Sequence, residues 1–306
     1  MISATLYSDP ACPWAYSESP ALRVIEWRYG DQLDWRLVLV GLTEEASQYE
    51  RRGYTPVRGV LGQARFRERY GMPFSTQVKP RLSATSRACR AVVATRLQHP
   101  GSEWRVFRAI QLANFNSPMV LDDDAHLADA LRIVPGIDPD HIVGLIDAPE
   151  VVEAYHRDKD ETRRAAGSAA ELQGKTATTD GPVRFTAPSV VFERDGTRLV
   201  AGGFQPAEAY DILVANIDPT VHREPPPEGP APLLERFPDG LTTQEVAALL
   251  AGNNEAPDRA AAEAALLELV AAGRAVRHPL GDDAMWQSPT AGEAMDFAAR
   301  YAVAVS

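Results

Sequence analysis

A single cysteine occupies a position where the surrounding spacing is typical of two. Residues 12–15 are Cys-Pro-Trp-Ala, so Ala15 stands where a Cys-x-x-Cys redox site carries its second sulfur. A cysteine just ahead of a helix can have its thiolate stabilised by free backbone N–H groups and by the helix dipole. Pro13 suits the first helical turn, and Trp14 adds a flat apolar surface beside the sulfur. We therefore expect Cys12 to be a nucleophile with a lowered pKa; the alternative is a buried, inert cysteine.

The residues around Cys12 predict that it lies at a strand-to-helix junction. Residues 4–8 (ATLYS) have the alternation of a strand and end at an Asp-Pro pair. Residues 13–30 carry apolar side chains near helical spacing and end at a glycine. Residues 33–42 (LDWRLVLVGL) form a more continuous apolar run, which predicts a buried strand. The segment is thus expected to be a β-α-β unit with Cys12 at its first turn.

The middle of the chain is predicted to be a large helical insertion. Amphipathic segments follow one another from about residue 43 to residue 167. Residues 188–203 then have the pattern of a β-hairpin whose turn is Asp195-Gly196, and residues 205–217 have that of a last helix. This order predicts an α/β protein with a thioredoxin-like fold that is interrupted in the middle.

The C-terminal part is predicted to be a second, smaller domain. A proline-rich linker at residues 223–232 separates a first domain, 1–222, from residues 233–306, which have the pattern of two helices and a hairpin, as in a winged-helix module. Between residues 230 and 290 there are four arginines and no lysine against nine acidic residues. Because phosphate neutralisation supplies most non-specific DNA affinity, we expect a packing, dimerisation or lid role instead.

Three stretches of the chain resemble the DsbA-like thioredoxin-fold proteins. Residues 8–22 (SDPACPWAYSESPAL) resemble the active-site segment of the cytoplasmic FrnE-like branch, which is Asp-Pro-x-Cys-Pro-Trp-Cys. Residues 185–192 (FTAPSVVF) resemble the loop that holds the family's cis-proline, and residues 202–210 (GGFQPAEAY) resemble its Gly-x-Gln-Pro segment. The resemblance covers about residues 1–217, including the length and position of the helical insertion.

The resemblance implies thiol–disulfide chemistry at a site made by two segments. The loop before the cis-proline would offer backbone groups to an extended peptide or a thiol ligand. Cys12 would be the catalytic residue. The implied substrate-binding residues are Pro13, Trp14, Ala15, Thr186, Ala187 and Pro188, with Gly203 and Gln205 as further candidates.

Ala15 is the main departure from the family pattern, because Cys12 cannot close a disulfide with it. Cys12 could instead form a mixed disulfide that a second thiol molecule resolves. It could also activate a small thiol or cycle through sulfenic acid. Alternatively, the protein is a non-catalytic binding or interaction protein. Cys89 is expected to be a buried structural cysteine; as a resolving partner it would need its Cα within about 7 Å of that of Cys12.

Composition limits the other classes of function. The net charge of the 306 residues is −11, which argues against a general nucleic-acid binder. No apolar run is long enough to cross a membrane, and the N-terminus lacks the pattern of a secretory signal. Two cysteines do not make a disulfide framework. We therefore expect a cytoplasmic protein in a reducing compartment, with no membrane or nucleic-acid partner.

The sequence predicts no metal site and no tightly bound cofactor. The six histidines are scattered, with no spacing suited to metal ligation. The expected partners are a protein thiol or disulfide, or a low-molecular-weight thiol that acts as co-substrate. The sequence leaves a homo-oligomer open.

One segment of this acidic chain is strongly basic. Residues 45–98 hold eleven lysines and arginines against three glutamates. Such a segment is either a solvated helical face or a basic rim around an anionic ligand or a thiolate. The sequence alone leaves both interpretations open.

Overall fold

The central sheet of the molecule is mixed. The computed structural model describes residues 1–290 and 292–297, and in these ranges the sheet has four strands in the order β2-β1-β5-β6. β1 and β2 are parallel, whereas β5 is antiparallel to both β1 and β6. The predicted β-α-β start and the predicted hairpin are therefore both present. The strands are β1 (Ile2–Ser8), β2 (Leu33–Leu39), β5 (Ser189–Arg194) and β6 (Thr197–Gly202).

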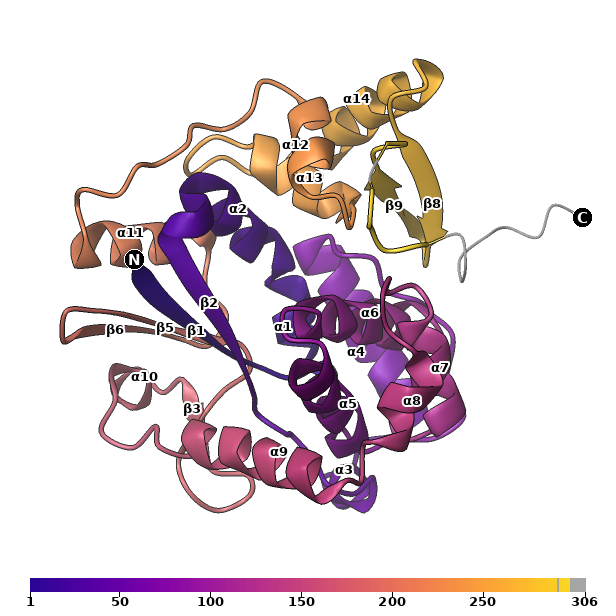
Figure 1. Ribbon diagram of the computed structural model, residues 1–306, viewed down its shortest axis with the longest axis vertical. Helices are drawn as coiled ribbons and strands as arrows, with labels where there is room; N and C mark the ends of the chain where they lie inside the picture. Colours follow the sequence, from indigo (N-terminus) through magenta and orange to yellow (C-terminus); the bar gives the residue numbers. More distant parts are fainter. Residues whose placement is uncertain (291, 298–306) are drawn as a thin grey trace, which may run out of the picture.

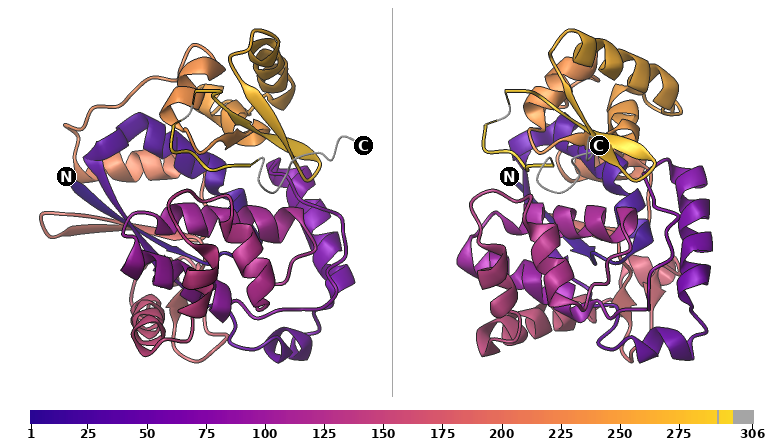
Figure 2. Two further views of the ribbon diagram at one scale, coloured as in Figure 1. Left: turned by 45° about the vertical axis from the view of Figure 1, so that its right-hand side comes forward. Right: turned by 90° about the vertical axis from the view of Figure 1, so that its right-hand side faces the viewer.

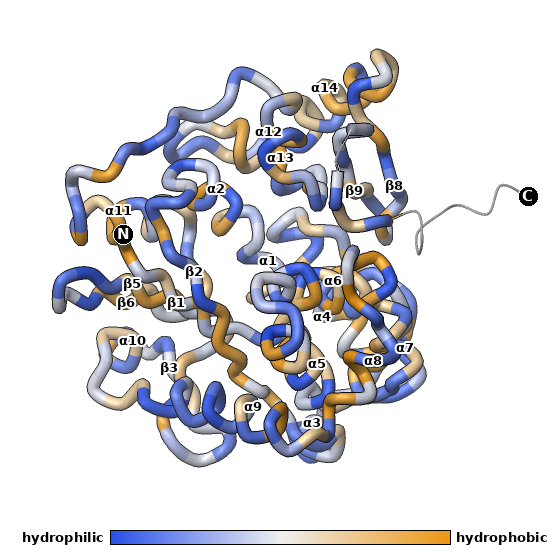
Figure 3. The backbone as a smooth tube through the Cα atoms, in the orientation of Figure 1, coloured by the Kyte–Doolittle hydropathy of each residue, from blue (hydrophilic) through white to orange (hydrophobic). Residues whose placement is uncertain are grey.

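Helices cover both faces of this sheet. Figure 1 shows α2 and α11 on one side and α9 and α10 on the other, and α11 packs on β5 and β6 while α9 packs on β2. The second half of β2 is buried in the interior, and α9 is largely hydrophilic at the periphery (Figure 3). The helices and short strands of this part are α1 (Pro13–Ser17), α2 (Ser19–Tyr29), η1 (Gly30–Gln32), α3 (Ser47–Arg51), α4 (Pro56–Tyr70), α5 (Ser86–Gln98), α6 (Glu103–Asn116), α7 (Asp124–Leu131), α8 (Pro139–Gly144), α9 (Pro149–Thr162), α10 (Ala169–Leu172), β3 (Thr176–Ala177), β4 (Arg184–Phe185) and α11 (Ala207–Ile217).

The segment predicted as one helix over residues 13–30 is divided in two at Glu18. α1 ends at Ser17 and α2 begins at Ser19. Pro20 lies in the first turn of α2, and because it has no N–H it cannot continue the hydrogen bonds of α1. The break gives the helix that follows Cys12 only five residues.

The C-terminal module consists of α12, α13, α14 and a small antiparallel sheet in the order β7-β9-β8. The two predicted helices and the predicted hairpin are present, while α12 and β7 were not predicted. α12 begins at Pro230, so the end of the expected linker is helical. The predicted module runs to residue 306, and residues 291 and 298–306 lie outside the described residues. Its elements are α12 (Pro230–Arg236), β7 (Leu241–Thr242), α13 (Thr243–Leu250), α14 (Arg259–Ala271), β8 (Val276–Leu280) and β9 (Asp283–Gln287).

This module packs tightly against the first domain. All the views place it at one end of the molecule next to α2 (Figures 1 and 2), and Val24 of α2 belongs to its hydrophobic core. Glu245 of α13 has no exposed surface and pairs with Arg108 of α6 at 2.8 Å. The same carboxylate accepts a hydrogen bond from Ser19 at the start of α2. The module is therefore joined to the α1–α2 region by apolar packing and by a buried ion pair.

Candidate functional site

Cys12 lies in the turn between β1 and α1, as predicted. It is the N-cap residue of α1, and its backbone N–H donates to the carbonyl of Asp9 at 3.1 Å. The carboxylate of Asp9 is fully buried and accepts hydrogen bonds from the backbone N–H groups of Ala11 and Leu42, each at 2.9 Å. Asp9 thus fixes the turn that holds the cysteine and joins it to the end of β2.

The proline loop faces Cys12 because of the register between two strands. Tyr7 of β1 pairs with Ser189 of β5, so the segment that follows β1 and the segment that precedes β5 meet at the same end of the sheet. The Ala187–Pro188 peptide bond is cis. The Cys12 thiol donates a hydrogen bond to the carbonyl oxygen of Ala187 at 3.0 Å. Two segments that are far apart in the sequence therefore form one site.

The prediction that the pKa of Cys12 is lowered is wrong. Only 6% of Cys12 is exposed, and burial raises the pKa of its thiol to about 12. The backbone N–H groups of Ala15 and Trp14 lower the pKa, as expected for a helix N-terminus, but they do not offset the loss of solvation, and the charge of Asp9 raises the pKa further. Cys12 belongs to a buried apolar cluster that gathers segments from β1, β2, β4 and the proline loop: its members include Tyr7, Val38, Val40, Ala165, Phe185, Ala187 and Val191.

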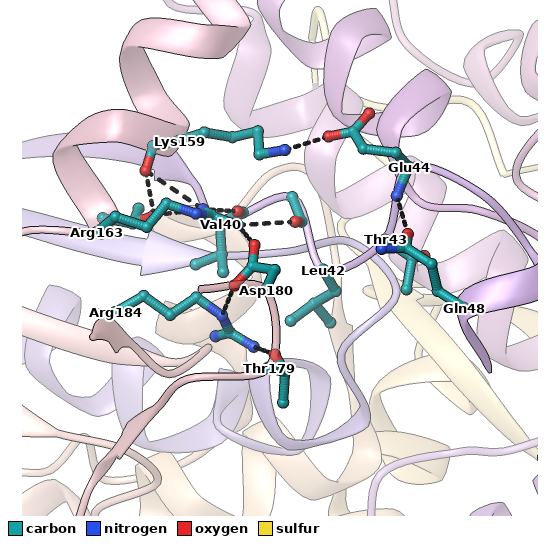
Figure 4. A network of polar contacts seen from close by, with 12 residues as sticks. Val40, Leu42, Thr43, Glu44, Gln48, Lys159, Arg163, Thr179, Asp180 and Arg184 are labelled. Atoms are coloured by element: carbon teal, nitrogen blue, oxygen red, sulfur yellow. Dashed lines mark hydrogen bonds and ion pairs between the residues drawn. The ribbon is translucent and has the colours of Figure 1, made fainter. Parts of the chain in front are cut away.

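The charge of Arg184, the first residue of β4, also acts on Cys12. Its charge lowers the pKa of the thiol, though less than burial raises it. Asp180 and Thr179 hold the guanidinium, the latter with its hydroxyl at 3.1 Å (Figure 4). Asp180 also binds Arg163, which donates to the carbonyl of Val40 at 2.6 Å. Arg184 and Arg163 thus share the single carboxylate of Asp180.

Cys12, Pro13 and Trp14 open onto a cavity of about 460 Å³. The aromatic part of its wall includes Trp14, whose ring meets that of Phe66 edge-on at 4.8 Å. Trp14 is 42% exposed, so it lies between the cavity and solvent. The rest of the aromatic wall is formed by Tyr49, Tyr54 and Phe115.

The basic segment 45–98 divides between the two interpretations that the sequence left open. Several of its arginines make ion pairs elsewhere, such as Arg87 with Asp124 and Asp147. Four of its cations line the cavity beside Cys12, and none of the described residues that line this cavity is acidic. These cations are Arg52, Arg58, Lys79 and Arg81.

The other predicted site residues do not line the cavity beside Cys12. Thr186 is half-buried, and its hydroxyl donates to the carbonyl of Lys175 at 3.0 Å. The backbone N–H of Gly203 donates to the hydroxyl of Ser189 at 3.0 Å, which ties β6 to the proline loop. Gln205 donates its backbone N–H to the carboxyl group of Glu18, a buried residue that the sequence analysis did not single out.

Cys89 is buried, as expected for a structural cysteine, and it contacts the same residue, Asp9, that fixes the turn of Cys12. It has no exposed surface, and burial raises the pKa of its thiol well above the ordinary value. Its thiol is 3.5 Å from the carboxylate of Asp9 and donates to it. Both cysteines are free.

Three solved structures resemble this one along most of their length. A candidate protein disulfide isomerase from Nitrosomonas europaea gives a TM-score of 0.54 at 19% identity, over 70% of this chain and 96% of that one. A candidate DsbA oxidoreductase from Streptomyces coelicolor gives a TM-score of 0.53 at 17% identity, over 74% of this chain and 92% of that one. The cytosolic disulfide reductase DsbM from Pseudomonas aeruginosa gives a TM-score of 0.50 at 17% identity, over 70% of this chain and 98% of that one. The chain has the DsbA-like thioredoxin fold.

The fold prediction is therefore confirmed, whereas sequence comparison adds no relative. No protein-family model matches the chain, and no curated protein matches it. Among residues 1–290 and 292–297, no helix is long and apolar enough to cross a membrane. Within the same ranges, no group of three or more His, Cys, Asp or Glu side chains could hold a metal ion.

Proposed function

We propose that the protein is a thiol–disulfide oxidoreductase that works through the single sulfur of Cys12. The observation that carries the proposal is the contact between the Cys12 thiol and the Ala187 carbonyl at the edge of a cavity. The DsbA-like fold supports the class of reaction. Its substrate would be a small thiol or a protein thiol or disulfide, as the motif Cys-Pro-Trp of the FrnE-like branch implies.

The reaction would need two exchanges, because Ala15 offers no second sulfur. In the first, the Cys12 thiolate attacks a disulfide, forms a mixed disulfide and releases one thiolate. In the second, a small thiolate attacks the substrate sulfur of the mixed disulfide. The Cys12 thiol is then restored, and the small thiol and the substrate leave as a disulfide. The small thiol supplies the electrons; one solved structure of DsbM holds GSH.

A raised thiol pKa would make this enzyme slow at neutral pH. Only the thiolate is the nucleophile, and burial raises the pKa of Cys12 to about 12. Turnover through Cys12 is therefore expected to rise with pH throughout the range in which the fold is stable.

A non-catalytic binding protein is the second candidate. Two observations favour it: burial keeps the Cys12 thiol protonated at neutral pH, and Ala15 stands in place of a second cysteine. Such a protein would keep the cavity and the proline loop as a ligand site without exchange. It differs from the first candidate only in the reactivity of Cys12.

Mass spectrometry and a turnover assay separate the two candidates. The intact protein would be incubated with oxidised small disulfides and analysed without reductant, beside the variant Cys12→Ser. If the proposal holds, the wild type carries an adduct on Cys12 only and reduces a disulfide substrate. The variant Cys12→Ser should not reduce the substrate. An unmodified Cys12, or equal turnover by the wild type and the variant, would contradict the proposal and favour the binding protein.

A further inference from the structure

We propose that the cavity beside Cys12 binds a small carboxylate with an apolar body, and that Lys79 holds the carboxylate group. The inference rests on the proposed function in that it takes this cavity for the substrate site. It adds the chemical class of the ligand.

Lys79 is a cation with neutral partners only. Its ammonium group donates to the side-chain oxygen of Asn114 at 2.9 Å and to the carbonyl of Met119. An ammonium group has three donors, so one is left for a ligand. Within the described residues no carboxylate pairs with Lys79, and burial lowers its pKa to about 7. Lys79 is half-buried, and a cation that has lost part of its solvation without gaining a counter-ion is stabilised when an anion joins it.

The other charged groups of the cavity do not supply an anion for Lys79. Arg52 and Arg58 donate to the carbonyls of Thr179 and Gly53, and neither makes an ion pair within the described residues. Arg81 pairs with Asp122 at 2.6 Å, so the nearby carboxylate is already engaged. Burial raises the pKa values of the Cys12 thiol and the Tyr49 phenol, so both of these groups are neutral at pH 7. The cavity therefore carries positive charge.

The apolar residues that line the cavity favour a ligand with an apolar part over a purely hydrophilic anion. Trp14, Phe66, Phe115, Leu42 and Leu121 line the cavity together with the cations. Cavities of about 300–1,000 Å³ with mostly apolar walls and a few polar groups are typical of small-molecule sites. An inorganic anion at Lys79 would leave these walls in contact with water, whereas an apolar body would cover them. Charge and walls together indicate an amphipathic carboxylate.

The test compares a carboxylate with its uncharged amide. Binding of naphthylacetate and of naphthylacetamide to the full-length protein would be measured by titration calorimetry. We expect the carboxylate to bind at least about tenfold more tightly than the amide, as for a charge-assisted hydrogen bond in a partly buried site. In Lys79→Met the preference is expected to be lost, while the affinity for the amide changes by less than about twofold.

Arg65→Met is the matched control, since it removes an exposed charge from α4 outside the cavity lining. The preference for the carboxylate should survive in it. In the wild type, the preference should fall from about pH 6 to about pH 9, because Lys79 loses its proton in this range. Equal affinities for the two probes, binding of neither at millimolar concentration, or an unchanged preference in Lys79→Met would each overturn the inference.

These measurements do not depend on turnover. The probes carry no sulfur, so they bind in Cys12→Ser if the inference holds, whether or not the wild type exchanges disulfides. Loss of exchange with retained probe binding would refute the proposed function alone. Exchange without a preference for the carboxylate would refute the ligand class alone.

Discussion

The thiol of Cys12 donates a hydrogen bond to the carbonyl oxygen of Ala187 at 3.0 Å. A thiolate cannot donate this bond, and its charge would face the lone pairs of the carbonyl oxygen. The contact therefore favours the protonated form, in the same direction as burial. It joins the nucleophile to the proline loop in a resting state that is not ionised.

Alkylation of Cys12 by iodoacetamide is expected to show this protonated state. Its rate should keep rising with pH beyond pH 10, because burial raises the thiol pKa to about 12. Cys89 serves as the internal control and should stay unmodified in the folded protein, since it has no exposed surface. Peptide mapping by mass spectrometry gives both rates. A midpoint at or below about 8.5, the value of a free cysteine, would contradict the proposed effect of burial.

Ala15→Cys is expected to restore a dithiol site. The backbone N–H of Ala15 interacts with the Cys12 sulfur, so a sulfur on residue 15 would start close to it. After mild oxidation the variant should lose the mass of two hydrogen atoms, and its reduced form should reduce a disulfide substrate while closing the same intramolecular disulfide. The double variant Cys12→Ser, Ala15→Cys is the control and should do neither. Two thiols that both stay reduced in excess oxidant would show that the turn holds them apart.

The order of strands and helices could be predicted because it is encoded locally. Residues 4–8 alternate, the hairpin turn has Asp195 and Gly196 at positive φ, and both signals need only neighbouring residues. α12 was missed because Pro230 and Pro232 suggested a stiff linker, although proline is compatible with a first helical turn. The two-residue strand β7 is too short to leave a periodic signal.

The position of Cys12 could be predicted, but the environment of its sulfur could not. The motif places Cys12 before a helix, and the helix does lower the thiol pKa as expected. The apolar cluster in which Cys12 is buried also contains Phe185, Val191 and Ala165, from segments that only the tertiary fold brings together. Lys79 was one of eleven basic residues in its segment; what sets it apart, its neutral partners and its place in the cavity, also comes from the fold.

Glu18→Gln is expected to stabilise the protein at alkaline pH. The carboxyl group of Glu18 has no exposed surface, and burial raises its pKa to about 8 from an ordinary value of 4.5. Between these values the folded state keeps a proton that the unfolded state has lost, so the stability that this group contributes is full below about pH 4.5 and is lost as the pH rises through 8.

Glutamine removes this dependence. We therefore compare the free energies of unfolding of Glu18→Gln and the wild type, measured in urea. The variant minus wild-type difference should be more favourable near pH 9 than near pH 4.5, by up to a few kcal/mol. Glu153→Gln, at an exposed position of α9, is the control and should show no such trend. A difference between the wild type and Glu18→Gln that stays constant with pH would refute the raised pKa.

Arg108→Met is expected to destabilise the whole molecule. It leaves the buried carboxylate of Glu245 without the guanidinium that, against burial, holds its pKa down to about 2. Removing one partner of a buried ion pair costs about 3–5 kcal/mol. Arg157→Met, which breaks an exposed pair with Glu153, should cost less than about 1 kcal/mol.

The pH dependence and the shape of the transition test the same contact. The stability that Glu245 contributes is full above about pH 4.5 and is lost as the pH falls toward 2, so the cost of Arg108→Met should shrink below about pH 4.

The same contact also joins the C-terminal module to α2 and α6. Urea should therefore unfold the wild type in one transition, which fluorescence and circular dichroism would follow. Two separate transitions in the wild type, with only one of them shifted by Arg108→Met, would mean that the module folds independently and that this ion pair does not couple it to α2 and α6.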